Sequence, residues 1–257
     1  MDELATGDSP LHQLDARTKI LTTFLFIVTV VSFNKYEVSA LTPFFLYPIF
    51  LISLGRLPAS FLMKKILLVS PLAVMVGLFN PLLDTETLMQ IGRVAISGGW
   101  LSFISILERF ALTVSAAMAL VSLTGMNALC EALIRLGLPK PFVVQLLFLN
   151  RYIFVLGGEV ERMSRARALR SCGRPTMNLN VFIQLVGHLL LRTIDRAERV
   201  YQAMLCRGFE GHIRVVKFSK IGRRDIAFVL IWAALFALFR CADSPLLLGH
   251  AVIGFLK

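Results

Sequence analysis

Two stretches of sequence decide the fold of this chain: GEVERMSRARALRSCG at residues 158–173 and NVFIQLVGHLLLRTIDRAERVYQAMLCRGF at residues 180–209. Both helical patterns end on the same kind of tripeptide, an Arg between small or apolar residues: Leu169-Arg170-Ser171 and Cys206-Arg207-Gly208. The glycines that follow, Gly173 and Gly208, are typical of helix C-caps. The pattern therefore predicts two helices that each present an Arg at the C-terminal end.

The composition around these stretches indicates a membrane protein. The chain has 257 residues, of which 56% are hydrophobic and 17% are charged, yet the net charge is +11. The mean hydropathy of +0.73 is well above that of a soluble domain. This combination predicts a polytopic membrane protein with its basic residues on one side of the bilayer. Nucleic-acid binding is disfavoured, because the basic residues follow or flank apolar segments.

The apolar runs predict an all-α fold with about five transmembrane helices. They are the following segments: Ile20–Phe33 extended back through Thr18, Val38–Leu54, Ile66–Leu83, Trp100–Leu123 and Ile226–Phe239. Pro71 and Pro81 are expected to kink the third span. The residues between the third and fourth spans, 84–99, are expected to form a polar loop.

The basic residues predict the orientation and a three-part division of the chain. Residues 125–224 hold 17 of the 27 Lys and Arg residues against six acidic residues, so this segment is expected on the cytoplasmic side. Counting spans then places the N-terminus inside and the loop 84–99 outside. The predicted parts are the N-terminal transmembrane helices at 1–124, an interfacial helical region at 125–224, and the last transmembrane helix and tail at 225–257.

The interfacial region is expected to contain a short helix and two long ones. They cover Asn127–Leu136, Phe142–Ser171 and Asn178–Cys206. The long helices reach about 40 Å at roughly 1.5 Å per residue, but their charged halves are too polar to cross a bilayer simply. We expect them to lie at the inner leaflet with their charged tips in the cytoplasm.

The fourth predicted span carries two charges, Glu108 and Arg109, which are functional candidates because they lie inside the membrane. A structural ion pair or a position near the loop is an equally good interpretation. The same span has a small-residue stripe at Ala111, Ser115 and Ala119, which favours close helix packing over a docking face for a partner.

Together these motifs resemble a known family. The two Arg-centred tripeptides, the string RAERVYQAMLCRGFEG, the opening SPLHQLDARTKIL, Phe79-Asn80-Pro81-Leu82 and Gln145–Phe154 are similar to the T component of energy-coupling-factor transporters, most closely the CbiQ type that serves cobalt uptake. The likeness runs from about Ser9 to Asp225. It implies that Arg170 and Arg207 end coupling helices, and that each docks in one of two ATP-binding-cassette ATPase subunits. Leu169, Ser171 and Cys206 depart from the commoner Ala-Arg-Gly form, which leaves the choice of subunit open.

The resemblance also implies the remaining partners and the location. A separate substrate-binding membrane subunit of the CbiM kind is expected, with a small accessory membrane subunit as an optional addition, in the bacterial cytoplasmic (inner) membrane. The chain has no phosphate-binding GxxxxGK[ST] motif, so no ATPase activity, catalytic residue or cofactor is expected. Neither the four His nor the four Cys residues have the spacing of a metal site. Nickel or a vitamin as cargo, a stand-alone permease and an intramembrane enzyme remain the alternatives.

Overall fold

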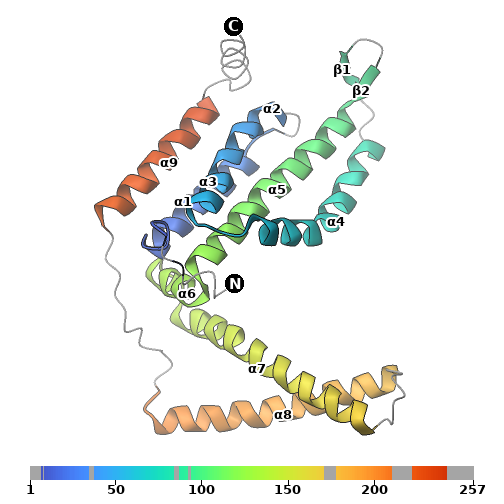
Figure 1. The fold of residues 1–257 in the computed structure, drawn as a ribbon, viewed down its shortest axis with the longest axis vertical. Helices are drawn as coiled ribbons and strands as arrows, with labels where there is room; N and C mark the ends of the chain where they lie inside the picture. The colour runs from blue at the N-terminus through green and yellow to red at the C-terminus, as the bar shows by residue number, and fades with distance from the viewer. Residues whose placement is uncertain are drawn as a thin grey trace. The chain divides into compact units, whose positions relative to one another are not determined.

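The structure is a computed structural model of the chain. The residues that it describes are 7, 9–34, 38–83, 87–91, 94–170, 178–209 and 222–241. Nearly all of them are helical, which confirms an all-α membrane protein (Figure 1). The chain forms two compact units: a first unit of Met1–Ala132 with Ser219–Lys257, and a second unit of Leu133–Phe218.

The first unit contains the helices expected to cross the membrane. In chain order they are α1 (Ala16–Val31), α2 (Val38–Leu41), the 3-10 turn η2 (Thr42–Phe45), α3 (Leu46–Leu54), α4 (Ala59–Leu83), α5 (Gly98–Thr124), the start of α6 (Met126–Arg135) and α9 (Arg223–Cys241). The second predicted span is thus interrupted by a 3-10 turn that contains Pro43. Proline lacks the amide hydrogen that a continuous α-helix needs, which accounts for the tighter turn.

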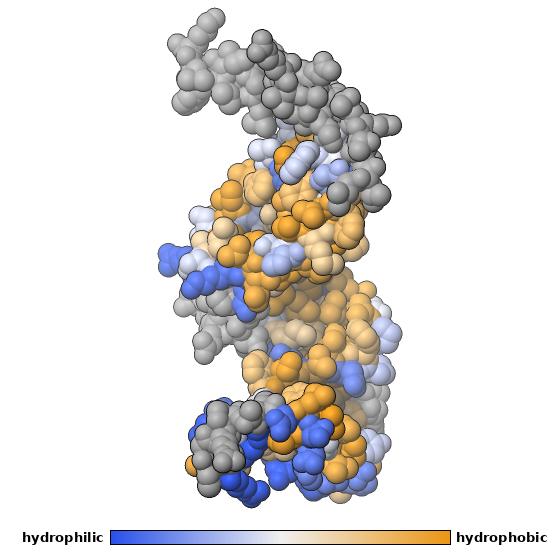
Figure 2. All heavy atoms as spheres, turned by 90° about the vertical axis from the view of Figure 1, so that its right-hand side faces the viewer, coloured by the Kyte–Doolittle hydropathy of each residue, from blue (hydrophilic) through white to orange (hydrophobic). Residues whose placement is uncertain are grey.

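The second unit is a pair of long helices, α7 (Lys140–Arg170) and α8 (Leu179–Cys206). Their bounds agree with the predicted helices to within two residues. In Figure 2, hydrophilic side chains gather around this pair, whereas apolar side chains dominate the visible surface of the first unit.

One local feature differs from the sequence-based expectation, and another agrees with it. The segment predicted as a plain polar loop contains an antiparallel pair of short strands, β1 (Thr87–Ile91) and β2 (Val94–Ser97). Their β-branched residues favour an extended backbone. Helix α4 contains both predicted prolines, and Figure 1 shows that it changes direction partway along, as Pro71 would require.

Three helices in the described part of the chain are long and apolar enough to cross a membrane: Leu62–Pro81 in α4, all of α5, and α7. Helix α7 was expected at the interface, but its first half is apolar for long enough to enter the bilayer. Helix α1, at 16 residues, is only about 24 Å long and shorter than the hydrocarbon core. The total of five spans therefore stays a prediction.

An aromatic cluster holds the first unit together. The Phe26 ring of α1 lies with its centroid 4.7 Å from Tyr47 of α3 and 5.5 Å from Phe236 of α9. The Trp232 ring of α9 is 4.8 Å from Tyr47 in an edge-to-face arrangement, which aromatic quadrupoles favour. The Thr23 and Tyr47 hydroxyls, both buried, are hydrogen-bonded at 2.8 Å. Helices α3 and α9 are thereby packed on α1.

Helix α5 packs closely on its neighbours through small residues. A Cβ atom on Gly77 of α4 would lie 2.8 Å from the Phe103 ring of α5, so only glycine permits this approach. Ser115 and Ala119, from the predicted small-residue stripe, are buried inside the same unit. This confirms helix packing as their role and leaves them unavailable as the partner face that the sequence had also suggested.

Candidate functional site

The first candidate tripeptide lies at the exposed end of α7. Leu169 is 80% exposed although it is a large apolar residue, and Arg170 is the last residue of the helix. The final carbonyl groups of a helix have no partner within it and carry a partial negative charge. A guanidinium is stabilised in that position. Ser171, the third residue of the motif, lies outside the described residues.

The second tripeptide forms a defined stop at the end of α8. Arg207 is the C-cap residue, and Gly208 has a φ of +75°, which glycine adopts without strain. The Phe209 amide donates to the Met204 carbonyl at 3.1 Å, and the Gly208 amide donates to Leu205 at 3.0 Å. This is the Schellman arrangement. The predicted glycine stop is therefore confirmed, with Arg207 at the cap itself and not in the last turn.

The two candidate arginines differ in their pairing from Arg162 and Arg165 of α7. Arg162 binds Glu159 at 2.6 Å, and Arg165 binds Glu161 at 2.6 Å. Within the ranges that the structure describes, the side chains of Arg170 and Arg207 have no hydrogen-bond or ion-pair partner. Both are exposed, as is Cys206. The site therefore presents two guanidiniums that are free to bind a carboxylate with paired hydrogen bonds.

A single carboxylate connects the two long helices. Glu159 of α7 accepts hydrogen bonds from Arg162 on its own helix and from Arg192 of α8, each at 2.6 Å. These hydrogen bonds hold the pKa of Glu159 below its usual range. The carboxylate is therefore ionised at neutral pH, and its hydrogen bonds to Arg162 and Arg192 link α7 to α8. The sequence showed no signal for this pair, because the two residues are 33 positions apart on different helices.

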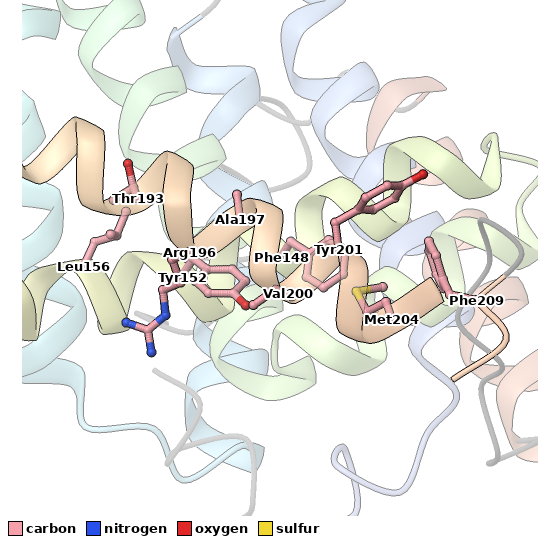
Figure 3. Close-up of a pocket in the computed structure, with 10 residues that line it drawn as sticks. All are labelled: Phe148, Tyr152, Leu156, Thr193, Arg196, Ala197, Val200, Tyr201, Met204 and Phe209. Carbon is pink, nitrogen blue, oxygen red and sulfur yellow. The ribbon is translucent and has the colours of Figure 1, made fainter. Parts of the chain in front are cut away.

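An apolar groove lies between α7 and α8 (Figure 3). It has a volume of about 340 Å³. The two helices and the turn after α8 contribute its lining: Phe148, Tyr152, Leu156, Thr193, Arg196, Ala197, Val200, Tyr201, Met204 and Phe209. No residue of α8 is buried, so its apolar face is exposed within this chain. Such a face is typical of a surface covered by membrane or by another apolar helix.

Glu108 and Arg109, the two charged residues of the fourth predicted span, differ in their surroundings. Arg109 donates from Nη2 to the Asn34 carbonyl at 2.5 Å, just beyond the end of α1. Arg240 of α9 donates to the Ser32 carbonyl at 3.2 Å, and its guanidinium lies 4.3 Å above the Phe33 ring. Two arginines thus bind backbone carbonyl groups in the segment that directly follows α1. Glu108 is half-buried, and a functional role for it stays a prediction.

The described ranges contain no group of three or more His, Cys, Asp or Glu residues that could hold a metal ion. Among the cysteines described there, Cys130 is buried, whereas Cys206 and Cys241 are exposed.

A buried polar cluster near the N-terminus is a feature that the sequence reasoning missed. Asp15 caps α1 by accepting from the Arg17 amide at 2.9 Å, and Asp225 accepts from the Asp15 amide at 2.9 Å. The capping role of Asp15 has a local sequence signal, since Asp before an apolar helix favours an N-cap. Its partner 210 positions away has none.

The chain is similar in sequence to known membrane transport proteins. Residues 7–217 match the family model described as CbiQ, cobalt transport protein. The chain is 29% identical over 230 residues to the energy-coupling factor transporter transmembrane protein EcfT of Bacillus subtilis (strain 168), which covers 84% of this chain and 86% of that protein. It is 28% identical over 221 residues to EcfT of Heliobacterium modesticaldum, covering 79% and 81%. An uncharacterised protein of Methanocaldococcus jannaschii is 26% identical over 247 residues, covering 92% and 84%.

Proposed function

The chain belongs to the CbiQ family of cobalt transport proteins, and from that premise we propose that it is the transmembrane coupling component of an energy-coupling-factor importer. In this function it binds two ATP-binding-cassette ATPases through Arg170 and Arg207. It transmits their motion to a separate substrate-binding membrane subunit, and the ATPases hydrolyse the ATP. The observation that carries the proposal is a pair of exposed arginines, each without a partner among the described residues, at the ends of two helices that Glu159 joins.

The electrostatics of the helix ends support docking on carboxylates. Each guanidinium projects from a helix C-terminus and has no intramolecular carboxylate among the described residues. Arginine binds a carboxylate through two parallel hydrogen bonds, whereas lysine binds it as a point charge. An acidic groove on each ATPase would therefore bind one helix end in one orientation.

The connection between α7 and α8 supports transmission of a force. Glu159 joins the helices near their middle, and the aromatic and aliphatic side chains of both helices line the groove between them. A displacement of either helix end is therefore expected to change the apolar surface of the pair. That surface fits an apolar helix of the substrate-binding subunit.

Cobalt is the cargo that we propose from the family. Proteoliposomes that hold this chain, its ATPases and its substrate-binding subunit should accumulate radioactive cobalt only when ATP is supplied to the ATPase side. Vesicles that lack this chain are the control, and equal ATP-driven uptake in them would contradict the coupling role. Uptake of nickel or a vitamin in place of cobalt would reassign the cargo and leave the coupling role intact.

The charge distribution supports an orientation in the cytoplasmic membrane. The basic residues of 125–224 are proposed to face the cytoplasm, with the N-terminus on the same side. We expect a single cysteine at position 93 to react with a membrane-impermeant maleimide on intact cells, and a single cysteine at position 167 to react only after the cells are opened. The reverse labelling pattern would contradict the proposal.

A further inference from the structure

Four helix termini meet at one end of the first unit. A Cβ atom on Gly55, the C-cap of α3, would lie 2.6 Å from the Leu123 side chain near the end of α5. Nζ of Lys19, near the start of α1, donates to the Leu123 carbonyl at 3.3 Å. Asp225, near the start of α9, accepts from the Asp15 amide at 2.9 Å. The end of α3, the end of α5 and the starts of α1 and α9 therefore lie together.

This end of the unit carries four exposed cationic side chains. We call them the basic rim: Arg56 directly after α3, Lys64 in the second turn of α4, and Arg223 and Arg224 at the start of α9. Within the described ranges, none of the four has a hydrogen-bond or ion-pair partner. The carboxylates of Asp15 and Asp225 at this end are buried and accept backbone amides. They leave the exposed charge of the rim without a counter-charge.

The backbone at Arg56 is strained. Its φ is +50°, which a glycine adopts freely and an L-residue with a side chain does not. The Arg56 amide donates to the Ser53 carbonyl at 3.2 Å, and the Leu57 amide donates to the Ile52 carbonyl at 3.1 Å. This is the Schellman arrangement, in which the position of Arg56 is usually a glycine. A strained position that keeps a charged side chain points to a role for that side chain.

The basic rim lies at the depth of the lipid headgroups. Arg56 follows the second predicted span by two residues, and Lys64 and Arg224 precede the third and fifth predicted spans by two residues each. The ends of a spanning helix lie where the hydrocarbon core meets the headgroups. At the opposite end of the unit, Arg109 and Arg240 are bonded to backbone carbonyl groups. The arginines without a partner are therefore those that lie beside the phosphates of one leaflet.

We propose that the basic rim binds the phosphate groups of anionic phospholipids, with Arg56 as the principal contact. A guanidinium binds a phosphate through two parallel hydrogen bonds, whereas the ammonium of Lys64 adds a point charge. The bound headgroups hold this end of α3, α4 and α9 at the membrane surface. The proposal goes beyond the coupling function and does not depend on it.

Local enrichment of an anionic lipid tests the proposal in the full chain. The chain is placed in phosphatidylcholine nanodiscs with a fluorophore on Ser60→Cys, after its four native cysteines are replaced by Ala. Ser60 is exposed and lies between Arg56 and Lys64 in the sequence. Quenching by spin-labelled phosphatidylglycerol, relative to spin-labelled phosphatidylcholine, measures the enrichment. We expect Arg56→Gly and Arg224→Ala each to lower it about fivefold, the factor for one cation at an anionic surface.

A variant at the opposite end of the unit is the matched control. Arg240→Ala also removes one exposed arginine of the first unit, but its guanidinium is bonded to the Ser32 carbonyl, so the enrichment at Ser60→Cys should stay as in the wild type. Unchanged enrichment in Arg56→Gly, or an equal loss in Arg240→Ala, would overturn the proposal. If Arg56→Gly does not fold, Arg224→Ala decides by the same criterion. Unchanged enrichment together with loss of ATPase co-purification in Arg56→Gly would assign the rim to the ATPase and likewise overturn the proposal.

A comparison of two substitutions at position 56 separates the charge from the backbone. Arg56→Gly and Arg56→Ala both remove the guanidinium, so both should lower the enrichment of phosphatidylglycerol to the same extent. In neutral detergent, Arg56→Gly should unfold at a higher temperature than Arg56→Ala, because only glycine adopts the positive φ without strain. Equal unfolding temperatures would overturn the argument from strain.

Discussion

Replacing Arg170 and Arg207 together by Ala is expected to release both ATPase subunits and to abolish ATP-driven uptake. On the proposed docking model, each substitution leaves a desolvated carboxylate of the ATPase without its partner. Removing one member of a buried charged pair costs about 2–5 kcal/mol, which corresponds to roughly 30-fold to several-thousand-fold in affinity at that contact. Co-purification of the ATPases with tagged variants measures binding, and uptake in proteoliposomes measures function.

The single variants and two controls make this prediction specific. Arg170→Ala or Arg207→Ala alone should weaken one of the two contacts. Arg170→Lys should rescue poorly, because lysine keeps the charge but loses the planar group that forms paired hydrogen bonds. Arg165→Ala is the matched control on α7: its side chain is exposed and already paired with Glu161, so its loss should cost only about 1 kcal/mol of contact with anionic lipid. Loss of the ATPases in Arg165→Ala but not in the double variant would refute the assignment.

Replacing Phe26 by Ala is expected to destabilise the first unit strongly. The side chain is fully buried and contacts the rings of Tyr47, Phe44 and Phe236. In water such a truncation costs about 3–5 kcal/mol. Within a membrane the transfer of apolar surface from lipid to protein contributes little, so the loss of packing dominates, and we expect about 1–3 kcal/mol.

Phe24→Ala is the matched control for Phe26→Ala. Phe24 lies on the same helix but is 63% exposed, so its truncation should leave the free energy of unfolding nearly unchanged. Unfolding of both variants in mixed detergent micelles, followed by circular dichroism, gives the comparison. Equal destabilisation by the two changes would contradict the placement of the aromatic cluster inside the unit.

The sequence predicted the helices well because their signals are local. The bounds of α7 and α8 follow from apolar periodicity and from the glycine after Arg207, and Gly208 adopts the positive φ that a C-cap glycine suggests. The exposure of Arg170 and Arg207 was expected because the same patterns place both residues at the ends of these helices. These features depend on residues within a few positions of one another, which a single sequence displays.

The contacts between distant residues could not be predicted from the sequence. Asp225 and Asp15 are 210 positions apart, and the sequence around neither residue indicates that the two are in contact. Arg109 was expected to be functional or to form a structural ion pair, yet it binds a backbone carbonyl, an acceptor that every residue offers. The strand pair between α4 and α5 was missed because both strands are short and lie in a segment that was predicted to be a polar loop. The contacts of Asp225 and Arg109 depend on tertiary packing, which local sequence patterns do not display.

Photo-cross-linking from the helix ends tests the central claim most directly. A photoreactive amino acid is placed at Leu169 or at Cys206, which are exposed neighbours of Arg170 and Arg207, and at Leu190 on the exposed apolar face of α8 as the control. The proposed docking predicts that the ATPase is captured from positions 169 and 206 and not from 190. Capture of the ATPase from position 190 alone would contradict docking at the helix ends.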